Sequence, residues 1–152
     1  MPLEQAIKYV ADWKQKGQKI VFTNGCFDIL HLGHVDYMEK ARNLGDRLIV
    51  GLNTDDSVSR IKGPARPIVA EESRARVMAA LAFVDVVVFF NDDTPLQLIG
   101  NILPDVLVKG SDYLTENIVG ADIVMTNGGK VETIDLVDGY STSGIIDKIK
   151  NE

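Results

Sequence analysis

Apolar residues recur along this 152-residue chain with two different periods, which predict helices and strands in alternation. Leu3, Ile7, Val10 and Trp13 are spaced as on one face of a helix, so residues 3–16 are predicted to be helical. Short runs rich in β-branched and aromatic residues predict strands instead. These runs are residues 19–24, 48–52, 84–90, 106–108 and 131–136.

Helical patterns separate the predicted strands. They cover residues 34–44, 71–81, 95–102, 121–126 and 144–150, the last preceded by the cap sequence Ser-Thr-Ser. Residues 53–67 are predicted to be a polar loop, because Gly63, Pro64 and Pro67 interrupt long regular structure. Strands that alternate with helices predict an α/β fold: a Rossmann-like, open, parallel five-stranded sheet with helices on both faces.

Polar residues follow four of the predicted strands. The first strand leads into GCFDILHLGH, the second into NTDD, the fourth into KGSDY and the fifth into DGYSTS. In a parallel sheet these strand ends lie at one edge, and ligands bind there beside the point where the strand order reverses. The sequence therefore predicts one functional site at the carboxyl edge of the sheet.

Composition limits the classes of function. A hydrophobic content of 45% and a charged content of 25% are typical of a soluble globular protein, and the length suits one domain spanning residues 1–152. The net charge of −6 argues against nucleic acid as a partner. The longest apolar stretch, residues 81–90, contains Asp85 and is too short to cross a membrane. One cysteine, Cys26, and an N-terminus without a signal pattern lead us to expect a cytoplasmic protein.

Two histidines stand three residues apart after the first strand. His31 and His34 could be metal ligands together with Cys26 or Asp28, but a zinc site needs further ligands and the chain has no other histidine or cysteine. Alternatively, they lie at a helix N-terminus that binds an anion, where Gly33 permits close approach of the backbone. A third interpretation is that either histidine only packs or caps the turn.

The stretch GCFDILHLGH, together with STSGII, resembles the HxGH nucleotidyltransferases, the cytidylyltransferase-like superfamily that includes glycerol-phosphate cytidylyltransferase. NTDDSV, KGPARP, VDVVVFFNDDTP, PDVLVKGSDY and IVGAD are most similar to the adenylyltransferase of ADP-heptose synthesis. The resemblance covers nearly the whole chain and implies a single nucleotidyltransferase domain with the nucleotidylyl transferase fold. Since this activity is often fused behind a sugar kinase, it also implies a separate sugar kinase in the same pathway.

This resemblance implies that AMP is transferred from ATP to heptose 1-phosphate for surface polysaccharide, with release of pyrophosphate. Such transfers depend on positioning and charge stabilisation rather than on a covalent nucleophile. The implied catalytic residues are His31, His34 and Lys62. Magnesium is expected to be bound through the triphosphate rather than by a protein cluster, with Asp28 as the nearest protein candidate.

The remaining site residues follow from the same motifs. For the nucleotide and its phosphates we expect Thr23, Asn24, Gly25, Cys26, Phe27, Gly33, Lys109, Ser141, Thr142 and Ser143. For the acceptor substrate we expect Asp28, Asn53, Asp55, Arg66, Asp112 and Tyr113. Taken alone, the Ser/Thr run would be an ordinary helix N-cap, and Lys109 could simply end its strand. The glycerol-phosphate branch carries an arginine a few residues upstream of this run, which DLVDGYSTS lacks.

Several alternatives stay open at this point. The enzymatic one is a cytidylyltransferase that uses CTP and glycerol 3-phosphate or a related alcohol phosphate. Others are a nucleotide-binding regulatory module and a metal-binding module. Arg74 and Arg76 are interpreted as partners in surface salt bridges. The sequence also leaves the oligomeric state open, although apolar residues near Phe89 or Tyr140 could serve a homodimer.

Overall fold

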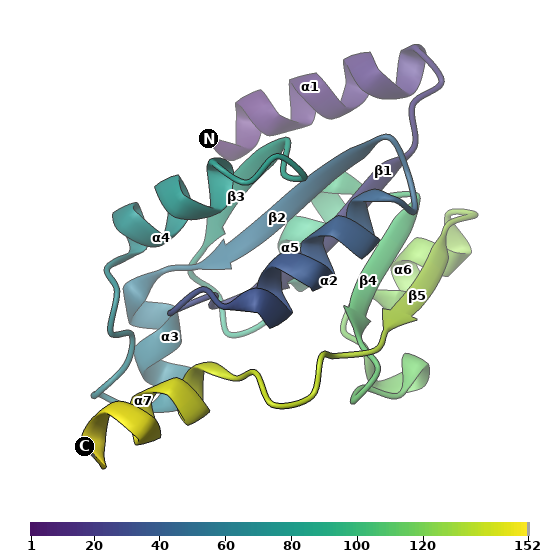
Figure 1. Cartoon of the computed structure of the whole chain (residues 1–152). Helices are drawn as coiled ribbons and strands as arrows, with labels where there is room; N and C mark the ends of the chain where they lie inside the picture. The colour runs from purple at the N-terminus through teal and green to yellow at the C-terminus, as the bar shows by residue number, and fades with distance from the viewer. Residues whose placement is uncertain (152) are drawn as a thin grey trace.

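The computed structural model describes residues 1–151 as a parallel sheet covered by helices. Its strand order is β3-β2-β1-β4-β5, and every neighbouring pair is parallel (Figure 1). The strands are β1 (Ile20–Gly25), β2 (Arg47–Asn53), β3 (Val86–Phe90), β4 (Val106–Gly110) and β5 (Lys130–Ile134). The predicted α/β fold with a five-stranded parallel sheet is thereby confirmed.

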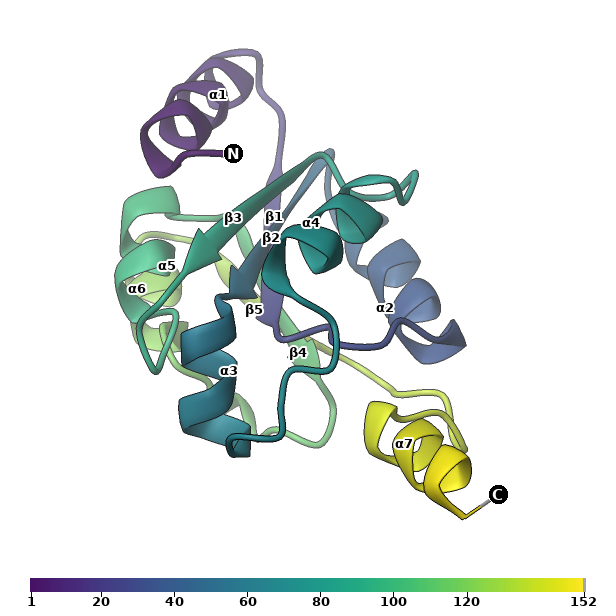
Figure 2. The same ribbon diagram turned by 90° about the vertical axis from the view of Figure 1, so that its left-hand side faces the viewer.

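Helices cover both faces of this sheet, as Figure 2 shows. On one face lie α1 (Leu3–Gln15), α5 (Leu96–Ile102) and α6 (Ala121–Thr126), and on the other lie α2 (Leu32–Arg42) and α4 (Glu71–Ala79). Neighbouring strand residues point to opposite faces, so Phe22 packs with the first group of helices and Val21 with the second. The sheet is therefore buried on both sides, which explains its nearly continuous apolar strands.

The remaining elements are α3 (Asp55–Lys62), the 3-10 turn η1 (Thr115–Asn117) and α7 (Thr142–Lys150). Figure 1 places α3 and α7 beyond the carboxyl ends of the strands. No helix among residues 1–151 is long and apolar enough to cross a membrane.

The predicted polar loop after β2 is wrong, because α3 occupies most of it. The Thr54 side chain caps this helix by accepting a hydrogen bond from the Ser57 N–H, and two aspartates in the first turn favour the helix dipole. Val58 is fully buried, so packing stabilises a helix that has only two buried residues. Gly63, at φ 102°, ends α3, and the proline-containing segment begins only there.

Two smaller shifts of element bounds bear on the site. α2 begins at Leu32 rather than near His34, which makes His31 the N-cap residue and puts His34 in the first turn. β1 and β4 run on to Gly25 and Gly110, so the polar residues that follow them start at the same edge of the sheet. β2 and β3 lie on one side of β1, and β4 and β5 lie on the other side. The strand order therefore reverses at β1, and parallel sheets form a crevice at such a point.

Candidate active site

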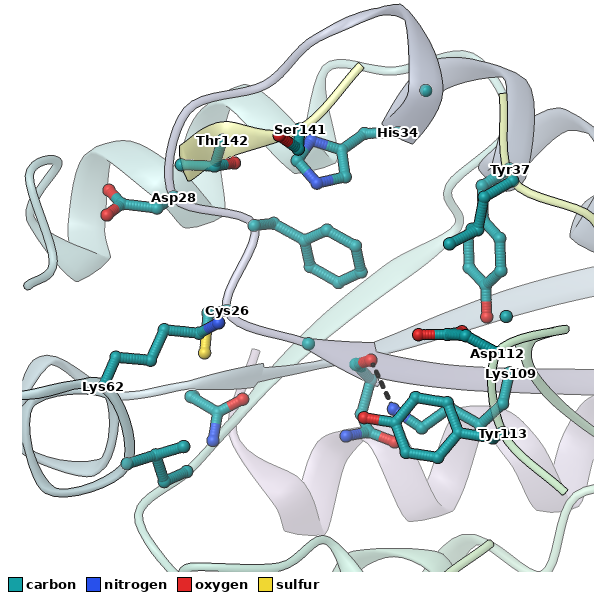
Figure 3. Close-up of a pocket in the computed structure, with 18 of the residues that line it drawn as sticks. Cys26, Asp28, His34, Tyr37, Lys62, Lys109, Asp112, Tyr113, Ser141 and Thr142 are labelled. Atoms are coloured by element: carbon teal, nitrogen blue, oxygen red, sulfur yellow. Dashed lines mark hydrogen bonds between the residues drawn. The ribbon is translucent and has the colours of Figure 1, made fainter. Parts of the chain in front are cut away.

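A cavity of about 610 Å³ opens at the carboxyl ends of β1 and β4 (Figure 3). Of the residues predicted for the site, all but Thr23 and Asp55 line it. They are Asn24, Gly25, Cys26, Phe27, Asp28, His31, Gly33, His34, Asn53, Lys62, Arg66, Lys109, Asp112, Tyr113, Ser141, Thr142 and Ser143. The fold thus collects motifs that are separated by more than a hundred residues in sequence.

Sequence reasoning missed another group of lining residues. They are Tyr37, Ile61, Phe90, Asp93, Thr94, Pro95, Gly110, Asn117, Ile118, Val119, Leu136, Val137 and Tyr140. Several lie inside stretches quoted above, such as VDVVVFFNDDTP and IVGAD, but nothing in their local pattern separates a cavity wall from ordinary core. Their signal is positional: the stretches around Phe90 and Leu136 follow the carboxyl ends of strands, the edge that the fold class assigns to ligands.

The two histidines stack on each other at the start of α2. Their ring centroids are 3.8 Å apart, with an angle of 23° between the planes. In each ring, the Nδ1 atom is buried and has no hydrogen-bond partner among residues 1–151. Buried polar atoms are rarely left unpaired, so these imidazoles have hydrogen-bonding capacity that the protein itself does not use.

Both histidines are neutral in the free protein at pH 7. Burial, and to a lesser extent the charge of His31, lowers the pKa of His34 from 6.5 to about 4. Burial also lowers the pKa of His31. An anion bound beside the rings would favour the protonated forms and oppose these shifts. The two imidazoles are therefore suited to hydrogen bonding with a phosphate group as neutral rings, rather than to carrying a permanent positive charge.

Tight packing fixes the loop that carries the histidines. Phe27 holds a left-handed backbone conformation at φ 45°, and its ring meets His34 edge-on at 5.3 Å. A side chain at Gly33 would bring its Cβ within 2.9 Å of the His31 ring, and one at Gly25 would come equally close to Phe27 at 2.9 Å. Glycine is thus required at both positions, and the strained Phe27 backbone is held by its surroundings.

Asp28 and Arg66 are paired with each other. The Asp28 carboxylate accepts hydrogen bonds from Arg66 Nε at 2.8 Å and from the N–H groups of Ile68 and Val69, each at 2.8 Å. Burial alone would raise the pKa of Asp28, but these backbone N–H groups and the guanidinium together lower it. Asp28 therefore binds the segment after α3 to the histidine loop, which positions that segment over the cavity.

Arg74 corrects our interpretation of a surface salt bridge. The residue is 2% exposed, and its guanidinium donates to the carbonyl oxygens of Val69, Cys26 and Asn53. It also donates to the Asp55 carboxylate at 2.8 Å, so the structure pairs Asp55 with Arg74 and does not place it among the residues that line the cavity. This one side chain joins the loops after β1 and β2 to the segment before α4. Arg76, by contrast, is exposed, and helical periodicity could not distinguish the two.

Two lysines reach the cavity from opposite sides. Lys62, the last residue of α3, is exposed and forms no ion pair within residues 1–151. Its charge favours the thiolate of Cys26, although burial has the larger effect and raises the pKa of that thiol. Lys109 donates to the Asn24 carbonyl at 3.2 Å and lies 5.2 Å from the centre of the Tyr113 ring. Burial lowers the pKa of Lys109, and the nearby Asp112 opposes that shift.

The Ser/Thr run lies at the N-terminus of α7 and faces the same cavity. Ser141 Oγ accepts from the Gly144 N–H at 2.9 Å, which is an N-cap, and Thr142 Oγ1 donates to the Ile29 carbonyl at 3.2 Å. Ser143 forms no side-chain hydrogen bond within the described chain. Capping occupies one acceptor of Ser141 and leaves its O–H free, so a capping role and a phosphate-binding role are compatible.

Thr23 lies under the floor of the cavity rather than in its wall. It is 0% exposed, and its hydroxyl contacts the Val108 carbonyl and the Tyr37 hydroxyl. Its predicted contact with a phosphate therefore stays a prediction, and the structure gives its side chain a supporting position.

Within residues 1–151, no three or more His, Cys, Asp or Glu side chains are placed to hold a metal ion. Asp28, the candidate nearest the histidines, already accepts hydrogen bonds from three protein groups.

Comparisons with known proteins show what this chain is similar to. The family model described as cytidylyltransferase-like matches residues 22–146. The bifunctional protein HldE of Magnetococcus marinus is 57% identical over 144 residues, which cover 95% of this chain and 30% of that protein. The protein of the same name from Syntrophotalea carbinolica is 57% identical over 136 residues, covering 90% of this chain and 28% of that one.

A solved structure is also similar. The lipopolysaccharide core biosynthesis protein of Thermoplasma volcanium superposes with a TM-score of 0.64 at 29% identity, over 82% of this chain and 100% of that one. The chain spans about 30% of the length of the bifunctional relatives.

Proposed function

Because this chain belongs to the cytidylyltransferase-like family, as its motifs predict, we propose that it is an adenylyltransferase that transfers AMP from ATP to heptose 1-phosphate. Pyrophosphate is the second product, and the ADP-heptose serves the synthesis of surface polysaccharide. The observation that carries this proposal is the stacked His31–His34 pair with unpaired Nδ1 atoms at the cavity wall. Similarity to the HldE proteins and to a lipopolysaccharide core biosynthesis protein supports the heptose acceptor.

In the proposed reaction, an oxygen of the sugar phosphate attacks the α-phosphorus of ATP as the bond to pyrophosphate breaks. Negative charge grows on the oxygens around that phosphorus and on the leaving group. His31 and His34 donate hydrogen bonds to these oxygens, and the N-terminus of α2 adds its dipole. Because no covalent intermediate is needed, Cys26 takes no chemical part despite lining the cavity.

Each of the two cavity lysines is assigned to a different substrate. Lys62, unpaired on the α3 side, neutralises the acceptor phosphate and stabilises the transition state. Lys109, on the β4 side, meets the nucleotide, and the start of α7 with Ser143 meets the β- and γ-phosphates. Arg66 is tied to Asp28, so its part is to hold the loop after Lys62 in place.

Magnesium would be held mainly by the oxygens of the triphosphate. Asp28 already accepts hydrogen bonds from protein donors, which supports this arrangement. The metal would supply charge neutralisation on the phosphates, and the residues described above would bind and orient the complex.

Further parts of the proposal concern the protein as a whole. We propose that residues 1–152 act as one nucleotidyltransferase domain in the cytoplasm. A sugar kinase activity would supply its acceptor, and the bifunctional relatives, of which this chain spans about 30%, are longer proteins.

One experiment tests the proposal against its alternatives. The purified chain is incubated with Mg²⁺, either ATP or CTP, and either heptose 1-phosphate or glycerol 3-phosphate, and pyrophosphate release is followed. We expect release with ATP and the sugar phosphate only. Release with CTP alone would replace the proposal by a cytidylyltransferase. Tight nucleotide binding with no release from any combination would favour a regulatory module.

A further inference from the structure

The histidine pair is part of a longer row of aromatic rings. The Phe27 ring meets His34 edge-on at 5.3 Å, and the His34 ring stacks on His31 at 3.8 Å. The Tyr140 ring in turn lies 6.3 Å from the His31 ring, with an angle of 26° between the two planes, which is within the range of aromatic pairs. His31 therefore has one ring beside it from α2 and a second ring from the segment that precedes α7.

Gly33 lets Tyr140 come this close to the first turn of α2. A Cβ added at Gly33 would lie 3.3 Å from the Tyr140 Cβ, besides 2.9 Å from the His31 ring. The hydrogen bond from Thr142 to the Ile29 carbonyl holds the same segment against the loop that carries His31. Two contacts between residues far apart in sequence thus bring Tyr140 to the histidine loop.

Core packing does not account for Tyr140. The residue is 48% exposed, its hydroxyl forms no hydrogen bond within residues 1–151, and the following helix α7 has no buried residue. Figure 1 and Figure 2 both show α7 outside the layers of helices that cover the sheet. The ring of Tyr140, rather than its hydroxyl, is therefore the part that has a partner in the protein, and the ring beside it is that of His31.

We propose that Tyr140 is a positioning residue for His31: its ring holds the imidazole in the stack with His34, so that the segment before α7 completes the histidine pair. The proposal rests on the nucleotidyltransferase function above, in which both histidines donate to the reacting phosphate. Donors to a transition state have to be held in one orientation, and an imidazole between rings from two elements loses freedom to rotate. Loss of the Tyr140 ring therefore lowers kcat and leaves nucleotide binding nearly unchanged.

The first test removes the ring and keeps an apolar side chain. Tyr140→Leu should lower kcat for pyrophosphate release about 5-fold, the size expected for one lost aromatic pair, while the KM for ATP stays within about 2-fold. Tyr140→Phe retains the ring and should restore the wild-type kcat. A wild-type kcat in Tyr140→Leu, or an equal loss in both variants, would overturn the proposal. A raised KM with unchanged kcat would also overturn it, because Tyr140 would then contact the nucleotide directly.

A double-mutant cycle tests whether Tyr140 acts through His31. If it does, the loss caused by Tyr140→Leu is absent once His31 is replaced, so the variant with both Tyr140→Leu and His31→Gln should have the same kcat as His31→Gln alone. Losses that multiply would mean an independent role and would overturn the assignment to His31.

A matched control separates the Tyr140 ring from a general effect of α7. Ile149 lies in that helix and is 68% exposed, so Ile149→Ala should leave both kcat and KM unchanged. A loss of kcat in Ile149→Ala equal to that in Tyr140→Leu would assign the effect to α7 as a whole and overturn the proposal. Since Tyr140 is also largely exposed, both variants are expected to fold, which circular dichroism checks.

The contact between the two rings can be measured without catalysis. The chain has two histidines, so proton NMR records two imidazoles, which His31→Gln and His34→Gln assign. An aromatic ring shifts the resonances of protons near it, so Tyr140→Leu should move the His31 signals of the free protein more than the His34 signals, and Tyr140→Phe should leave both nearly in place. Unmoved His31 signals in Tyr140→Leu would overturn the proposal.

These measurements separate the proposal from the function on which it rests. The NMR comparison uses the free protein, so its result does not depend on which nucleotide or acceptor the chain uses. If Tyr140→Leu moves the His31 signals but no pair of substrates releases pyrophosphate, the ring contact stands and the proposed reaction fails. If wild type and Tyr140→Leu release pyrophosphate with the same kcat, the proposed reaction stands and the positioning role fails.

Discussion

Two helices present their N-termini to the same cavity, yet the protein holds them very differently. α2 buries Tyr37, Met38 and Ala41 against the sheet, and the loop before it is fixed by Arg74 through the Cys26 carbonyl. α7 has no buried residue, and a hydrogen bond from Thr142 to Ile29 ties its first turn to that same loop. Buried packing and the Arg74 hydrogen bond therefore hold the histidine end of the site, whereas the Ser/Thr end is held through an exposed helix.

This difference suggests a division of work. Transition-state stabilisation demands donors that do not move, and in the proposed reaction the α2 end would supply them. A weakly held helix can adapt as the β- and γ-phosphates enter and leave, and few stabilising contacts are lost when it moves. The following predictions test this division, from the largest expected effect to the smallest.

The largest effect should come from the rigid end. His34→Ala removes a donor from the reacting phosphate, and we expect kcat to fall by about 10²–10³ because lost donors of this type cost that much. Thermal unfolding should change little, since the His34 side chain forms no hydrogen bond to the protein through Nδ1. Leu32→Ala, at a 53% exposed position in the same turn, is the matched control for pyrophosphate release. A variant with nearly normal turnover would remove the histidines from the mechanism.

Arg74→Leu should loosen the rigid end itself. Three carbonyl oxygens and the Asp55 carboxylate would lose their donor, so we expect a loss of about 3 kcal/mol in the free energy of unfolding. Urea denaturation measures it. Arg76→Leu on the exposed side of the same helix should stay within about 0.5 kcal/mol. Similar losses in the two variants would mean that the Arg74 network adds no stability.

Burial of the histidines should appear in the pH dependence of stability. The folded-state pKa of His34, about 4, lies below the unfolded value of 6.5, so the unfolded chain takes up its proton first as the pH falls. Stability should be complete above pH 6.5 and decline toward pH 4, by at most about 3 kcal/mol less the effect of solvent screening. Unfolding curves across this range, with His34→Gln as reference, measure the slope. A His34→Gln slope equal to the wild-type slope would contradict the assigned pKa.

The same shift predicts proton uptake when the triphosphate binds. The anion would raise the pKa of both histidines, so ATP should bind more tightly as the pH is lowered from 8 to 6. Calorimetry in buffers with different ionisation enthalpies counts the protons. Absence of uptake would place the triphosphate away from the histidines.

The smallest effect belongs to the weakly held end. Ser141→Ala removes the N-cap of α7, which should destabilise that helix locally by about 1 kcal/mol and raise the KM for ATP a few-fold. Hydrogen exchange in α7 detects the local loss. Ser143→Ala removes no hydrogen bond within the described chain, so a raised KM with unchanged exchange would identify a direct phosphate contact.

The site was only partly predictable from sequence. His31, Gly33 and His34 form a compact motif whose position after a strand predicts a turn at the cavity, and its binding of phosphate stays a prediction. α3 was missed because two prolines and a glycine nearby outweighed a short amphipathic pattern, although Thr54 and two aspartates formed a cap. Arg74 was misjudged because burial of one face of a helix depends on what the other elements place there.

The pattern of apolar residues by itself determined the alternation of strands and helices, and the polar residues at the strand ends determined at which edge of the sheet a site was predicted. Those features are local: they depend on side-chain period, β-branching and short motifs. Only the tertiary structure decided which side chains are free to act. Asp28 and Arg66 neutralise each other, Arg74 holds three segments together, and Thr23 hydrogen-bonds with Tyr37 under the cavity floor. These assignments depend on hydrogen bonds between residues far apart in sequence, for which no local pattern gives a signal.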